Sequence, residues 1–228
     1  MISILGDAMM IAGKDLKNEL KTKQTIGIML VFSALGVLVF SFAFDPVNST
    51  VQAVIPGLVW VITIFSGLIG LNRSFVSELE NDCLIGLRLA PIDLTSIYIG
   101  KVIANLVMVS FVQVISIPLL FLLFGYRFAG SCFWFILVIF CGTYGFIVVG
   151  TFLAALAANA KNSEMLLPVL LLPLISPLMI AAVQATKAAV ETASIGYAGS
   201  WLRLIAGYDL LFTAICFLLF EFVMEDSL

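Results

Sequence analysis

Six long runs of apolar residues dominate the sequence and constrain its fold more than any other feature. A helix rises ~1.5 Å per residue, so a run of about 20 residues spans the ~30 Å hydrocarbon core of a bilayer. The sequence therefore predicts an all-α integral membrane protein with six transmembrane helices. The predicted spans are residues 26–44, 51–71, 102–124, 132–158, 165–183 and 208–223.

The length of the chain limits what else it contains. The spans use most of the 228 residues, which leaves no room for a separate catalytic domain of the usual ~100–150 residues. We therefore expect residues 1–228 to form a single transmembrane domain, with any chemistry inside the helix bundle or on a partner protein.

Residues 1–25 are too polar to cross a membrane, but they have a helical pattern. Apolar residues recur at spacings of three and four, and lysines occupy the other side. Such a helix lies in the membrane interface, with its apolar stripe toward the acyl chains and its lysines at the headgroups. A solvated tail is the alternative. The stripe consists of Leu5, Met9, Ala12, Leu16 and Leu20, opposite Lys14, Lys17, Asn18 and Lys21.

The basic residues predict an orientation. If the N-terminus is cytoplasmic, the inner segments carry eight Lys and Arg residues, whereas the outer segments carry only Arg127, Lys187 and Arg203. Cytoplasmic loops of membrane proteins hold the excess of basic residues. We therefore expect both termini to be cytoplasmic.

Residues 184–207 are too polar for a span and too apolar for a free loop. They include Lys187 and Glu191 at i, i+4 spacing, and Trp201 at an expected interface depth. We interpret them as an outer re-entrant segment of short helices that packs on the bundle, since irregular backbone at membrane depth must be covered by protein. An ordinary extracytoplasmic loop is the alternative.

The segment from residue 72 to residue 101 is the most charged connection in a chain with only 11% charged residues. Its pattern predicts a short amphipathic helix that begins near Ser74, ends at Gly86 and is separated from the next span by Pro91. Asp93 suits the N-cap of that next span. One face carries Phe75, Val76, Leu79 and Cys83, and the rest carries Glu78, Glu80, Asn81 and Asp82.

An apolar face on a cytoplasmic loop needs a cover. We interpret the 72–101 segment as a docking element for a soluble cytoplasmic protein, with Phe75, Glu78, Leu79 and Glu80 as the candidate contacts. In the alternative interpretation, Phe75 and Leu79 lie against the lipid surface or the ends of the bundle itself.

Several stretches of the sequence together resemble the CcmB family, the membrane permease subunit of an ABC transporter used in c-type cytochrome maturation. The resemblance covers nearly the whole chain. It implies a fold similar to export-type ABC permeases and a place in the bacterial cytoplasmic (inner) membrane. The matching stretches are PGLVWV (56–61), NRSFVSELE, CLIGLRLAP, IYIGK, LLPLISPLMIAA (171–182) and GYDLLF with FLLFEFVMED near the C-terminus.

The resemblance implies that residues 75–89 form the coupling helix of a cytoplasmic loop, seated in a groove of the ATPase subunit CcmA, with Glu78 and Glu80 at the contact. It also implies a homodimer, the membrane subunits CcmC and CcmD, and the haem chaperone CcmE as partners. The function would be haem export or ATP-driven release of the haem-loaded chaperone. Ile85 departs from the acidic or polar residue expected there. A scaffold that only anchors the complex is the alternative.

Three absences in the sequence point to a subunit that is not itself an enzyme. The Gly-Lys pairs at Gly13 and Gly100 lack the glycine five positions upstream that a P-loop requires, so ATP would bind the partner subunit. Histidine is absent and the four cysteines form no CxxC pair, which argues against a metal site and against direct ligation of haem. Nothing suggests a nucleic-acid partner.

Two features of the last spans are candidates for a gate or a substrate contact. Asp209 is the most costly side chain within the apolar runs, although it is also in position to cap the last helix after Gly207. Pro168, Pro173 and Pro177 each remove a backbone donor from the fifth span, which bends it either statically or during a transport cycle.

Overall fold

The computed structural model describes residues 2–44, 49–80, 93–126, 128–158, 163–191 and 195–225, and within these ranges it contains helices and no strand. Helix α1 at the N-terminus lies outside the predicted spans, and the short α3 overlaps the start of the second. The helices are α1 (Ile2–Thr22), α2 (Gln24–Ala43), α3 (Ser49–Gln52), α4 (Ile55–Glu80), α6 (Leu94–Leu123), α7 (Cys132–Ala158), α8 (Ser163–Glu191) and α9 (Ile195–Glu225).

Six of these helices, α2, α4, α6, α7, α8 and α9, are long and apolar enough to cross a membrane, which confirms the predicted fold class. Their outward faces carry large apolar side chains, for example Phe42 at 87% exposure and Leu122 at 78%. A water-soluble surface rarely tolerates such a continuous apolar area, whereas lipid favours it. The chain is a multi-pass membrane protein.

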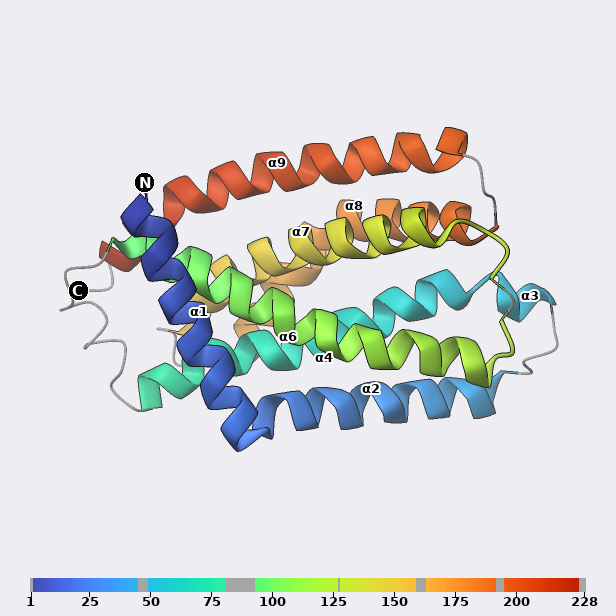
Figure 1. The fold of residues 1–228 in the computed structure, drawn as a ribbon, viewed down its shortest axis with the longest axis horizontal. Coiled ribbons are helices and arrows are strands. Elements are labelled where there is room, and N and C mark those ends of the chain that lie inside the picture. Colours follow the sequence, from blue (N-terminus) through green and yellow to red (C-terminus); the bar gives the residue numbers. More distant parts are fainter. Residues whose placement is uncertain are drawn as a thin grey trace.

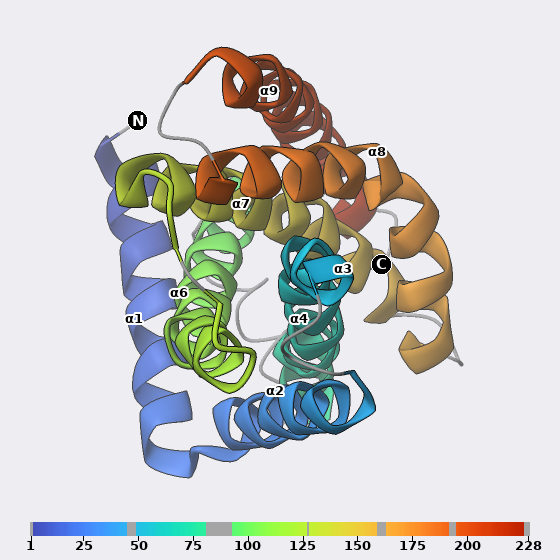
Figure 2. The same ribbon diagram turned by 90° about the vertical axis from the view of Figure 1, so that its right-hand side faces the viewer.

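The bundle is layered around α7 (Figures 1 and 2). Helix α9 lies at one edge, α7 and α8 form the next layer, α6 and α4 follow, and α2 closes the opposite edge. Helix α7 contacts α4, α6, α8 and α9, which explains why most of its side chains from Gly142 to Ala155 are buried. The start of α1 and the end of α9 lie at the same end of the bundle.

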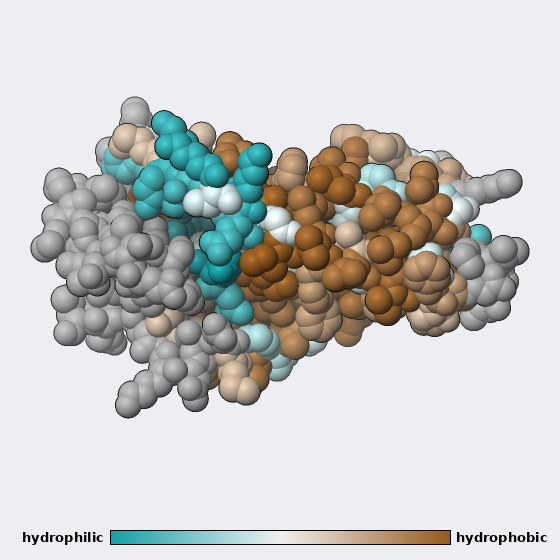
Figure 3. Space-filling model, turned by 90° about the horizontal axis from the view of Figure 1, so that it is seen from below, coloured by the Kyte–Doolittle hydropathy of each residue, from teal (hydrophilic) through white to brown (hydrophobic). Residues whose placement is uncertain are grey.

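Helix α1 crosses that end at a steep angle to the spans, as an interfacial helix should (Figure 1). Leu5 and Met9 of the predicted stripe are about 60% exposed, as side chains that face lipid would be, whereas Ala12 of that stripe is buried together with Ala8 and Ile11 where α1 packs against α6. Ala8 and Gly100 allow the two helices to approach closely, and Leu5 and Met9 are left to face lipid. On the face that Figure 3 shows, hydrophilic residues gather toward this end and hydrophobic residues cover most of the other described surface.

A one-residue turn joins α1 to α2. Lys23 adopts a left-handed conformation with φ of 52°, which is uncommon for a residue with a side chain. The Glu19 carboxylate accepts a hydrogen bond from the Ile26 N–H at 2.8 Å, and so satisfies one of the free donors at the start of α2. The direction of α1 is therefore fixed relative to α2.

Residues 184–207 differ from the expected set of short separate helices. Residues up to Glu191 extend α8 and those from Ile195 onward begin α9, so the two spans are longer than predicted. The cause lies in the alanines of this stretch, which favour a helix and bury their small side chains. Ala185 and Ala189 have 0% exposure and Ala188 has 8%.

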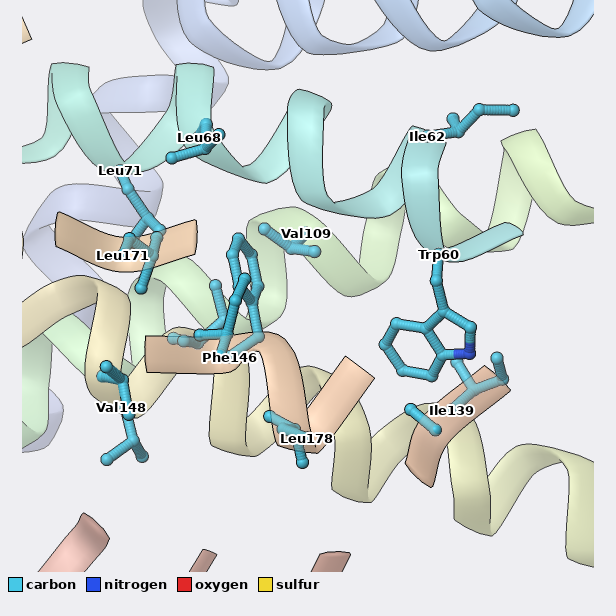
Figure 4. Packing of buried hydrophobic residues seen from close by; sticks show 14 of the residues in the cluster. Trp60, Ile62, Leu68, Leu71, Val109, Ile139, Phe146, Val148, Leu171 and Leu178 are labelled. Atoms are coloured by element: carbon cyan, nitrogen blue, oxygen red, sulfur yellow. The ribbon is translucent and has the colours of Figure 1, made fainter. Parts of the chain in front are cut away.

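Trp60 and Phe146 anchor the buried core between α4 and α7 (Figure 4). Trp60 is 1% exposed, its ring lies against Gly142, and its Nε1–H donates to Thr186 Oγ1 at 2.9 Å. Phe146 is fully buried beside Gly67, where a β-carbon would come within 2.5 Å of the ring. Glycines thus provide the space that these two aromatic side chains occupy.

Candidate functional site

Helix α4 continues beyond its candidate membrane span at the end of the bundle that holds α1. Its apolar part ends at Ser74, but the helix continues to Glu80. At ~1.5 Å per residue the six additional residues project about 9 Å. The predicted separate helix starting near Ser74 is therefore wrong, because α4 passes through this position without a break. The amphipathic character of this helical end stays a prediction from the sequence.

The predicted docking residues fall in and beyond this projection. The last part of α4 contains Phe75, Glu78, Leu79 and Glu80. The structure describes the backbone of these residues, and it describes the side chains of α4 only up to Ser74. Gly86 and Pro91 belong to residues 81–92, outside the described part of the chain. Their contacts with a partner therefore stay predictions.

The return of the chain to the membrane follows the prediction closely. Asp93 is the N-cap of α6, and its Oδ1 accepts hydrogen bonds from the Thr95 N–H at 3.1 Å and the Thr95 hydroxyl at 2.7 Å. This arrangement satisfies a donor at the first turn of the helix and fixes where α6 begins.

A buried lysine lies where the 72–101 segment joins the bundle. The Lys101 side chain is only 2% exposed, and its Nζ lies 2.9 Å from Asp15 Oδ2 of α1. The same Nζ donates to the Ser74 carbonyl of α4 at 3.0 Å. Sequence reasoning missed this cluster, because it used Lys101 only to assign the inner side. The signal that could have found it is a lysine followed by a long apolar run.

Further into the bundle, buried polar side chains connect α4, α6 and α7. Gln113 Nε2 donates to the hydroxyls of Thr63 at 3.2 Å and Thr143 at 2.8 Å. Asn105 Nδ2 donates to Thr151 Oγ1 at 3.2 Å. Since helices in lipid gain little from apolar contact alone, these bonds contribute to holding the three helices in register.

Asp209 lies in the middle of α9 and faces α7 and α8. The residue is 8% exposed, and its Oδ1 is buried with no hydrogen-bond partner in the described ranges. Gly145 of α7 leaves the space for this carboxyl, because a β-carbon there would overlap Oδ1. The alternative that Asp209 caps the last helix is wrong, since α9 begins at Ile195. A buried carboxyl in a membrane bundle is costly and is usually functional.

The proline-containing part of α8 lies beside Asp209. Figure 2 shows that α8 changes direction along its length, and Pro173 and Pro177 lie inside the helix with their side chains exposed. Pro177 has no N–H for the Pro173 carbonyl, which instead accepts from Ser176 Oγ at 2.8 Å. Tyr208, adjacent to Asp209, donates to the Leu174 carbonyl at 3.2 Å.

The structure places Asp209 on the inner side of α8, whereas the side chains of Pro173 and Pro177 are exposed on the same helix. A role of these residues as a gate or substrate contact stays a prediction. For metal binding, the described residues contain no group of three His, Cys, Asp or Glu side chains that could hold an ion. The expectation that the whole chain binds no metal stays a prediction.

Comparison with known proteins adds an independent line of information. A family model described as CcmB protein matches residues 7–226. The chain is 27% identical to heme exporter protein B of Rhodobacter capsulatus over 178 residues, covering 78% of this chain and 81% of that protein. It is 30% identical to heme exporter protein B of Pseudomonas aeruginosa over 163 residues, covering 71% and 72%. The corresponding Escherichia coli K12 protein is 29% identical over 182 residues, covering 77% and 79%.

Proposed function

Because this chain belongs to the CcmB protein family, we propose that it is the membrane permease subunit of an ATP-driven complex that handles haem during c-type cytochrome maturation. The observation that carries the proposal is the family match from residue 7 to residue 226, which includes all six candidate spans. The relatives named heme exporter protein B support the assignment to haem handling.

The projecting end of α4 supports coupling to a partner ATPase. In this proposal the 72–101 segment docks in a groove of the ATPase CcmA through Phe75, Glu78, Leu79 and Glu80. Binding of ATP would then bring two ATPase subunits together and so move two docked permeases. The proposal therefore requires a homodimer. An apolar face flanked by acidic residues suits a protein groove, because apolar burial provides affinity and the charges provide orientation.

The proposed orientation places the α1 end of the bundle in the cytoplasm of a bacterial inner membrane. Among the basic residues that the structure describes, most belong to α1 or to the adjoining ends of α4 and α6. They are Lys14, Lys17, Lys21, Lys23, Arg73 and Lys101, against Lys187 and Arg203 at the opposite end. The excess of basic residues marks the cytoplasmic side.

The substrate is either haem itself or the haem-loaded chaperone CcmE, released from CcmC and CcmD. We favour release of the chaperone, because the sequence contains no histidine to serve as an axial ligand of haem iron. Asp209, with the bend at Pro173 and Pro177, is the proposed gate or substrate contact. Its carboxyl is a buried polar group on the helix next to α8, and α8 lacks a backbone donor at each of these prolines.

Purification of the tagged chain in detergent tests the proposal. We expect an ATPase to copurify and to hydrolyse ATP, and we expect Phe75→Asp to weaken its association by about 10- to 100-fold, as loss of one buried aromatic contact predicts. Phe44→Asp, the same change beyond the far end of α2, is the matched control and should have no effect. Absence of any ATP-hydrolysing companion would refute the proposal. Normal cytochrome maturation by Phe75→Asp would favour the scaffold instead.

A further inference from the structure

We propose that Lys101 is a positioning residue that fastens both ends of the 72–101 segment to α1, so that α1 moves together with the segment when a partner acts on it. The inference rests on the proposed function in one respect only, namely that the partner is an ATPase. The fastening itself is a property of the described residues and can be tested without any partner.

The burial of Lys101 is the first observation. Its side chain is 2% exposed on the predominantly apolar helix α6. Burying an ammonium group costs several kcal/mol unless the group is paired and hydrogen-bonded. An apolar residue at this position would satisfy the packing of α6 without that cost. The lysine is therefore better explained by the groups that it joins than by the folding of α6.

Those groups belong to the two ends of the same segment and to α1. Ser74, whose carbonyl accepts from Nζ at 3.0 Å, is the last residue of the membrane span of α4. Lys101 itself lies two turns into α6, where the chain returns. Asp15, at 2.9 Å from Nζ, lies on α1. One side chain thus connects α4, α6 and α1 at the base of the projection.

The backbone around Lys101 reinforces this connection. Gly100 allows α1 to approach so closely that a β-carbon there would lie 2.8 Å from the Ala8 carbonyl oxygen. Ile11 and Ala12 are buried in the same contact. Since α1 also continues into α2 through the turn fixed by Lys23 and Glu19, a displacement of the segment would be passed through α1 to α2. The contact thus extends the coupling unit from one loop to two further helices.

Two substitutions dissect the cluster. Asp15→Asn removes the ion pair with α1 but preserves the bond from Lys101 to Ser74, whereas Lys101→Met removes both. We expect amide hydrogen exchange of α1 in the purified chain to accelerate roughly tenfold in either variant, as loss of a buried ion pair predicts. Exchange at the end of α4 should accelerate only in Lys101→Met. Lys17→Met, at an exposed lysine of α1, is the matched control and should match the wild type.

The second measurement concerns coupling. In the purified complex we expect Lys101→Met to hydrolyse ATP within about twofold of the wild-type rate while cytochrome maturation falls roughly tenfold, since the motor runs but its movement is not passed on. Unchanged exchange in α1, or an equal effect of Lys17→Met, would overturn the inference. Parallel loss of assembly, ATP hydrolysis and maturation in both Asp15→Asn and Lys101→Met would show a merely structural role and would also overturn it. If no ATPase is found at all, the proposed function fails but the exchange result still decides the fastening.

Discussion

Replacing Trp60 with alanine is expected to lower the free energy of unfolding by about 3–5 kcal/mol, the cost of deleting a buried aromatic side chain. The ring is 1% exposed and fills the space that Gly142 leaves between α4 and α7. Its Nε1–H donates to Thr186 of α8, so three helices lose a shared contact. Because helices in lipid are held by packing and hydrogen bonds, the cavity and the lost bond account for most of the effect.

Denaturation in detergent with increasing dodecyl sulfate, followed by circular dichroism, measures this change. Trp60→Phe should cost less, because it keeps a six-membered ring in the core and loses the hydrogen bond together with one smaller ring. Thr186 still donates to the Ala182 carbonyl. Trp134→Ala, at a half-buried tryptophan near the start of α7, is the matched control. Equal destabilisation by Trp60→Ala and Trp134→Ala would contradict the packing that we describe.

Gly145→Val is expected to destabilise the protein by about 1–3 kcal/mol, the usual cost of overpacking a filled interior. A β-carbon at Gly145 overlaps the Asp209 carboxyl and lies 2.9 Å from Leu178 Cδ2. Asp209→Ala removes the obstruction together with a buried acceptor that has no partner in the described ranges, so alone it should cost little. In the double variant the valine methyl groups occupy the vacated space, and stability should return close to that of the wild type.

This pair of substitutions separates packing from function. The Gly145→Val, Asp209→Ala double variant should fold but lack the carboxyl, so cytochrome maturation reports on the carboxyl alone. If Asp209 is a gate or substrate contact, maturation is lost while unfolding stability is normal. Additive destabilisation in the double variant would show that the two residues do not share one space, and normal maturation would remove Asp209 from the proposed site.

The six spans could be predicted from the sequence because a bilayer imposes one strong requirement, a long apolar helix, and each run meets it alone. The N-cap at Asp93 could be predicted for a similar reason, since an acidic residue just before an apolar helix satisfies local backbone donors. The break near Ser74 was wrong. The change from an apolar to an amphipathic pattern marks the end of the candidate span of α4. Such a change does not require the helix to end there.

The features that sequence reasoning missed depend on contacts between distant residues. From the sequence alone, Lys101 is one of the basic residues that mark the inner side. Its contacts with Asp15 and Ser74, which are far away in the sequence, are evident only in the structure. Gly207 predicts a helix start near Asp209, whereas α9 passes through that glycine without a break. In both cases the neighbouring helices, and not the local sequence, decide what the charged side chain contacts.

Binding of an ATPase to the 72–101 segment is the central element of the proposed mechanism. A photoreactive amino acid placed at position 75, irradiated in native membranes, tests this directly, with position 44 as the control. We predict a cross-linked product between the permease and an ATP-hydrolysing subunit from position 75 and none from position 44. A product with an ATPase from both positions, or from neither, would contradict the account.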